Sequence, residues 1–110
     1  MYTTEYYQDG NEKKPFKAWL DKLRKKDMRA AAKIDIALDR AESGNFGDHK
    51  FERDGVWEIR IDYAAGYRIY YSVINGKIIL LLAGGTKPTQ DVDINKAVKY
   101  LADYQKRPKL

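Results

Sequence analysis

The sequence predicts a single α+β domain over residues 1–110, in which an N-terminal strand, a helical hairpin, an antiparallel three-stranded meander and a C-terminal helix follow one another. Three observations predict this class. The length is that of one domain, and 44% of the residues are apolar, which is enough for a core. Apolar residues in the first half have helical spacing. In the second half, alternating apolar residues flank Asn75-Gly76, a dipeptide typical of tight hairpins.

The first half of the chain is predicted to hold one strand and two helices. Residues 2–7 are rich in tyrosine and threonine, which favour a strand. Apolar residues then recur at helical spacing in residues 16–23 and 28–41. Asp27 is a suitable N-cap for the second helix, and Gly44 is typical of its C-terminal end. Because few residues separate the helices, we expect an antiparallel hairpin that covers one face of a sheet.

The second half is predicted to hold three strands and a final helix. Residues 56–63 and 67–73 alternate between apolar and polar side chains. Residues 77–83 are apolar at every position after the lysine, which predicts a central strand covered on both faces. Thr89 is the expected N-cap of the last helix. Residues 45–50 are expected to form a loop.

Composition excludes several kinds of chemistry. The chain has no cysteine, and His49 is its only histidine, expected to be a solvated loop residue. No cluster of metal ligands is visible, so neither a metal nor a cofactor is expected. Neither a membrane span nor a signal peptide is visible, which favours a cytoplasmic protein. The net charge is +5, but Lys106, Arg107 and Lys109 supply three of these charges, so an anionic partner is only weakly indicated.

Two arginines are predicted to meet on one face of the sheet. Residues i and i+2 share a face of a strand, so Arg60 and Arg68 emerge together on the face away from the helical hairpin. Arg68 is expected to be directed to solvent. With Tyr70 between them, the two guanidiniums would form a bidentate anion site. Alternatively, Arg60 pairs with Glu58 or Asp62, as exposed sheet charges do. The side chains expected to pack against the hairpin are Trp57, Ile59, Ile61, Tyr67, Ile69, Tyr71 and Val73.

A glycine pair after the third predicted strand is a second candidate feature. Residues 84–85 free the backbone to direct N–H groups at an anion before a helix begins. Lys87 and the hydroxyls of Thr86 and Thr89 would complete this cradle. Because neighbouring strands of a meander are antiparallel, Lys87 would leave the sheet near Arg68. The alternative is an ordinary turn from strand to helix.

Three stretches of the sequence carry a family resemblance. They are residues 55–61 (GVWEIRI), 66–71 (GYRIYY) and 80–94 (LLLAGGTKPTQDVDI), supported by residues 16–20 and 44–48. Together they make nearly the whole chain similar to the RelE/ParE toxin superfamily. The similarity is greatest to its HigB-like branch, the phage-derived or addiction-module killer proteins.

The resemblance implies a RelE-like toxin of a type II toxin–antitoxin system. Such a toxin is a ribosome-dependent, metal-independent mRNA endoribonuclease, in which a 2′-hydroxyl attacks the adjacent phosphate and translation is inhibited. The implied partners are the ribosome, mRNA and a cognate antitoxin, expected to be a helix-turn-helix protein. Arg60, Arg68 and Lys87 match the family's basic catalytic residues. Further residues assigned to RNA binding are Tyr70, Thr86, Thr89, Gln90 and Lys50.

Two questions stay open at this point. The C-terminal tyrosine of some RelE enzymes has no clear match in residues 90–93, so the general base is Lys87, Tyr70, Glu58 or a ribosomal group. The function also has two alternatives. One is a ParE-like inhibitor of DNA gyrase, which three cations in one groove disfavour. The other is a non-catalytic module that binds RNA or the ribosome.

Overall fold

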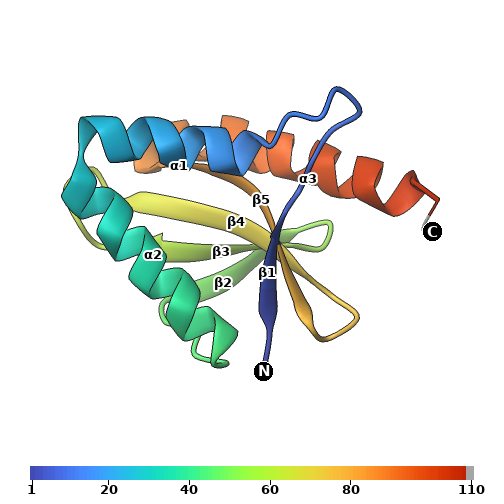
Figure 1. The fold of residues 1–110 in the computed structure, drawn as a ribbon, viewed down its shortest axis with the longest axis horizontal. Helices are drawn as coiled ribbons and strands as arrows, with labels where there is room; N and C mark the ends of the chain where they lie inside the picture. The colour runs from blue at the N-terminus through green and yellow to red at the C-terminus, as the bar shows by residue number, and fades with distance from the viewer. Residues whose placement is uncertain (109–110) are drawn as a thin grey trace.

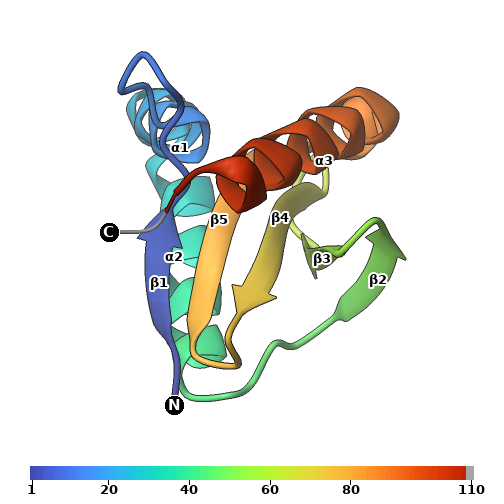
Figure 2. The same cartoon turned by 90° about the vertical axis from the view of Figure 1, so that its right-hand side faces the viewer.

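The computed structural model describes residues 1–108 and confirms the α+β class, with one mixed sheet of five strands and three helices (Figure 1). The elements are β1 (Thr3–Tyr6), α1 (Pro15–Lys26), α2 (Met28–Glu42), β2 (His49–Arg53), β3 (Val56–Ile61), β4 (Tyr67–Ile74), β5 (Ile78–Thr86), the 3₁₀ turn η1 (Lys87–Thr89) and α3 (Gln90–Lys106). The strand order is β1-β5-β4-β3-β2. β1 is parallel to β5, and the other neighbours are antiparallel. Helices α1 and α2 cover one face of the sheet and α3 crosses the other (Figure 2).

The sheet is larger than the predicted three-stranded meander. Strands β3, β4 and β5 follow one another as expected, and the turn at Asn75 and Gly76 has the two positive φ angles of a tight hairpin, 53° and 67°. However, β1 joins the same sheet beside β5, and residues 49–53 form a strand where a loop was expected. β2 is an edge strand that is mostly exposed, so its sequence carries little of the apolar alternation by which strands are recognised.

The two first helices meet at a corner instead of forming an antiparallel hairpin (Figure 1). Asp27 alone separates them, with an extended backbone (φ −150°, ψ 92°). Its N–H donates to the carbonyl of Leu23, and its carboxylate accepts from the N–H of Ala30, so the predicted N-cap is confirmed. A single extended residue gives too little chain for a reversal, and α2 therefore runs obliquely across the sheet.

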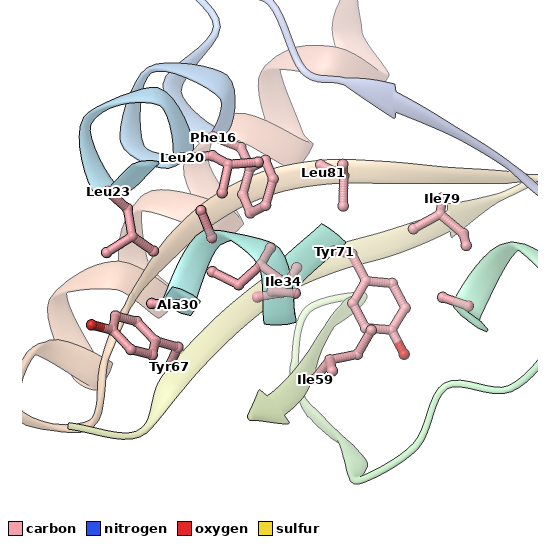
Figure 3. Packing of buried hydrophobic residues seen from close by; sticks show 13 residues of the cluster. Phe16, Leu20, Leu23, Ala30, Ile34, Ile59, Tyr67, Tyr71, Ile79 and Leu81 are labelled. Atoms are coloured by element: carbon pink, nitrogen blue, oxygen red, sulfur yellow. The ribbon is translucent and has the colours of Figure 1, made fainter. Parts of the chain in front are cut away.

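The main core lies between this helix pair and the sheet (Figure 3). Phe16 and Ile34 are fully buried, and Ile69 meets them from the sheet. Most of the alternating residues predicted to face the helices do so, but Val73 is 36% exposed because it lies near the end of β4. A second cluster under α3 includes Tyr70 and Leu82. β5 contributes to both clusters, as predicted for a strand covered on both faces.

Candidate functional site

The three predicted catalytic cations line one cleft at one end of the sheet. Arg60 and Arg68 are directly opposite each other in the register of β3 and β4. Lys87 begins the 3₁₀ turn that follows β5. The cleft has a volume of about 500 Å³, and the carboxylates of Asp48 and Asp62 also line it. The predicted proximity of Arg60, Arg68 and Lys87 is therefore confirmed, and their catalytic role stays a prediction.

The turn between β3 and β4 fixes the position of Lys87. Ala64 and Gly66 have positive φ angles of 51° and 79°, which turn the chain tightly within a few residues. The carbonyl of Gly66 then accepts a hydrogen bond from the N–H of Lys87 at 3.0 Å. The end of β5 is thus fastened to the loop that joins the two arginine strands.

Arg60 lies at the open side of the cleft. Its side chain is 37% exposed, and its Nη2 donates to Asp48 Oδ1 at 2.8 Å. The predicted alternative, an ion pair with Glu58 or Asp62, is confirmed for Glu58, whose Oε2 lies 3.9 Å from Nε, but the closer partner is Asp48. The hydrogen bond and the charge of Asp48 raise the pKa of Arg60. Arg60 therefore stays positively charged, and an anion that enters the cleft would bind it beside Asp48.

Arg68 is buried, which corrects the expectation that it is directed to solvent. Only 9% of the residue is exposed, because α3 covers this face of the sheet. Its Nη1 lies 3.4 Å from Oε2 of Glu58, a carboxylate with no exposed surface. The Nε atoms of Arg60 and Arg68 are buried without an acceptor among residues 1–108. Each guanidinium therefore has an N–H group beside the cleft that forms no hydrogen bond within residues 1–108.

Glu58 and Tyr70 lie beneath the cleft, and both are too deeply buried to serve as the general base of a reaction in it. Burial, followed by the negative charge of Glu52, raises the pKa of Glu58, while Arg68 opposes the shift. Tyr70 is fully buried, and burial together with the charge of Glu58 raises the pKa of its phenol. The raised pKa keeps this phenol protonated at neutral pH, which excludes Tyr70 as a phenolate base. Its complete burial excludes it as a direct RNA contact.

The glycine pair does not form the predicted anion cradle. Gly84 and Gly85 continue β5 and pair with β4, so their backbone groups belong to the sheet. Both glycines are required by close packing. A Cβ on Gly84 would lie 2.2 Å from the ring of Trp19, and one on Gly85 would lie 1.8 Å from Asp93 Oδ2. The pair permits α1 and α3 to approach the two faces of the strand.

The other residues assigned to RNA binding lie outside the cleft. Thr86 and Thr89 line a separate groove between α1 and α3, where the Thr89 hydroxyl donates to Asp93 at 2.5 Å. The side-chain amide of Gln90 is turned inward and donates to Glu58 Oε1 at 3.0 Å. Lys50 lies on β2, 3.8 Å from a carboxylate oxygen of Glu52.

Two residues of this site were missed or only partly recognised from the sequence. Asp48 directly precedes β2, and the pairing of β2 with β3 brings it to Arg60. The sequence did not suggest that pairing. Glu58 and Arg60 are two residues apart in one strand, so the sequence predicted that they share a face of the sheet. It did not predict that Glu58 is completely buried. His49, expected to be a solvated loop residue, is indeed exposed but begins β2.

Two absences hold for residues 1–108. No group of three or more histidine, aspartate or glutamate side chains is placed to hold a metal ion in this part of the chain. Within the same residues, no helix is both long and apolar enough to cross a membrane.

The fold and the cleft define a class: a small α+β domain with three cations at one end of its sheet. The model of the phage-derived Gp49-like proteins matches residues 18–106. The chain belongs to this family, which is associated with toxin–antitoxin systems. A protein of Haemophilus influenzae, named only as an uncharacterized protein, is 50% identical over 82 residues, which are 74% of this chain and 81% of that protein.

Proposed function

We propose that this protein is the toxin of a type II toxin–antitoxin system, and that it cuts mRNA on the ribosome without a metal ion. The observation that carries this proposal is the convergence of Arg60, Arg68 and Lys87 on one cleft from β3, β4 and the turn after β5. The HigB-like branch of the RelE/ParE superfamily, an action in the cytoplasm and a helix-turn-helix antitoxin belong to the same proposal, and they rest on the sequence resemblance.

The cleft suits a phosphodiester as substrate. Arginine stays protonated at physiological pH, so Arg60 and Arg68 act by stabilising negative charge and not as bases. In the reaction, the 2′-oxygen forms a bond to the adjacent phosphorus while the bond from phosphorus to the 5′-oxygen breaks. The 2′ proton is lost and the leaving 5′-oxygen gains a proton, which leaves a 2′,3′-cyclic phosphate and a 5′-hydroxyl. Three cations around the phosphate would stabilise the additional charge of this transition state.

Acid–base catalysis has a small part in this account. Tyr70 is excluded by its burial, and Glu58 has no exposed surface from which to take a proton from RNA. If the ribosome holds the mRNA with the 2′-oxygen in line with the leaving group, positioning supplies much of the rate enhancement. The protein then contributes charge stabilisation at the phosphate.

A basic corner at the same end of the sheet as the cleft, but against its other face, supports a polyanionic partner. The corner is the junction of α1 and α2, where Lys22, Lys25, Lys26 and Arg29 are exposed and form no ion pair with another of residues 1–108. Lys22 and Lys26 line a hollow together with Tyr67, which precedes Arg68 in β4 and faces α1 and α2. Such a surface fits the phosphates of folded RNA, and its affinity should fall steeply as the salt concentration rises.

The proposal is tested by adding the purified protein to translating ribosomes and mapping the 5′ ends of the mRNA. We expect discrete cuts that carry a 5′-hydroxyl, and cuts that persist when EDTA is in excess and polyamines support the ribosome. Variant Lys77→Ala is the matched control, because Lys77 lies in the turn at the other end of the sheet. Gyrase-linked DNA breaks in place of RNA cuts would instead support a ParE-like inhibitor. Ribosome binding without cuts would support a non-catalytic module.

A further inference from the structure

The carboxylate of Glu58 occupies the point where β3, β4 and α3 meet. It has no exposed surface. Its Oε2 lies 3.4 Å from Nη1 of Arg68 and 3.9 Å from Nε of Arg60. Its Oε1 accepts a hydrogen bond from the amide of Gln90 at 3.0 Å, in the first residue of α3. One buried group thus contacts both arginines of the cleft and the helix that covers them.

Hydrophobic packing alone does not account for this arrangement. A buried carboxylate is costly unless it is paired, and the nearby carboxylate of Glu52 adds repulsion. The ion pair with Arg68 holds a long, flexible side chain in one orientation before any ligand is present. A guanidinium that is already ordered loses less conformational entropy when an anion arrives, and it requires no reorganisation during the reaction.

We propose that Glu58 is the positioning residue of the cleft, which holds the Arg68 guanidinium toward the substrate phosphate and ties the start of α3 to the same point through Gln90. This inference rests on the proposed function, because it assumes that an anion enters the cleft. Glu58 acts through Arg68 and touches no substrate. Arg60 has its own close partner in Asp48, so it depends less on Glu58.

The central test is a double-mutant cycle on the rate of mRNA cleavage at saturating ribosome concentration. Glu58→Gln keeps the shape of the side chain and removes its charge. We expect the rate to fall about 10- to 100-fold, the loss typical when the partner behind a functional ligand is removed, while the affinity for ribosomes changes little. In an Arg68→Ala background the same change should alter the rate per folded molecule less than about twofold, because the group that Glu58 positions is gone. Glu5→Gln is the control, since Glu5 is exposed on β1, which β5 separates from the arginine strands.

A second readout does not require cleavage. The Nε–Hε resonance of Arg68 is identified by its loss in Arg68→Ala, and inorganic phosphate serves as the probe. We expect Glu58→Gln to shift this resonance and to weaken its response to phosphate, while Glu5→Gln does neither. If Glu58→Gln does not fold, Glu58→Asp decides the matter, since it keeps the charge but withdraws it from Arg68 and should reduce the cleavage rate.

The outcomes separate the two proposals. Parental cleavage and an unchanged Arg68 resonance in folded Glu58→Gln would overturn the positioning role, as would a full additional loss of rate in the Arg68→Ala background. Absence of cleavage by the unsubstituted protein, combined with the expected change in the Arg68 resonance, would overturn the proposed function and leave the positioning role intact.

Discussion

The sheet face beneath α1 and α2 and the face beneath α3 share the same strands but differ in chemistry at the end that holds the cleft. The first face is apolar from β5 to β3, with Phe16 and Ile34 fully buried against it. The second is apolar under most of α3, but at β3 and β4 it buries Glu58 and Arg68. Burial of a charged pair stabilises a fold less than apolar packing of similar volume does. The difference indicates that the buried ion pair on the α3 face contributes less to folding stability than apolar side chains would, and that it orders the charged groups of the cleft.

The largest expected effect on stability is the loss of Arg68, because its removal leaves the buried Glu58 carboxylate without its closer cation. Arg68→Ala should lower the free energy of unfolding by about 3–5 kcal/mol. Arg60→Ala, at a half-buried position directly opposite, should change it by no more than about 1 kcal/mol, because its close partner Asp48 is exposed. Urea unfolding followed by circular dichroism measures both.

The same experiment contains its own control. Adding Glu58→Gln to Arg68→Ala should restore most of the lost stability, because no uncompensated charge is then buried. If the double variant is as unstable as Arg68→Ala alone, the cost comes from lost packing volume, and the contrast between the two faces is weaker than described.

A smaller effect is expected on the pH dependence of stability. Burial and the charge of Glu52 raise the pKa of Glu58 above its ordinary value of 4.5, so the folded protein holds this proton more tightly than the unfolded chain. The stability advantage of the unsubstituted protein over Glu58→Gln should therefore decrease as the pH rises from about 4.5 through the folded pKa, and then level off. The groups that face Glu58 are Glu52 from β2, Arg60 from β3, Arg68 and Tyr70 from β4, and the uncharged amide of Gln90 from α3.

This pH effect is measured as the difference in unfolding free energy between the two proteins in one buffer series. A difference that increases with pH over the same range would mean that Arg68 outweighs burial and that the pKa of Glu58 is lowered in the folded state.

Local periodicity explains how far the sequence could predict this site. The alternation in β3 and β4 and the signal of Asn75-Gly76 set which strands are neighbours, so the juxtaposition of Arg60 and Arg68 followed from the sequence. The burial of Arg68 did not follow, because it depends on α3 returning across the sheet from later in the chain. β2 was missed because an exposed edge strand needs no apolar alternation.

The glycine pair shows the same limit at a smaller scale. From the sequence, Gly84-Gly85 is either an anion cradle or an ordinary turn from strand to helix, because glycine permits unusual backbone directions. Glycine is required at these two positions because Trp19 and Asp93 approach β5 from opposite faces. These are contacts between elements distant in sequence. Residue type alone could not separate these two explanations.

The measurement that tests the central claim most directly is the mRNA cleavage rate of Lys87→Ala on ribosomes, beside Lys77→Ala. Both lysines are exposed, so both variants should keep the parental melting temperature. If the cleft stabilises charge on the scissile phosphate, Lys87→Ala should cut about 10²- to 10³-fold more slowly, and Lys77→Ala should cut at the parental rate. A folded Lys87→Ala protein that cuts mRNA as fast as Lys77→Ala would contradict the account.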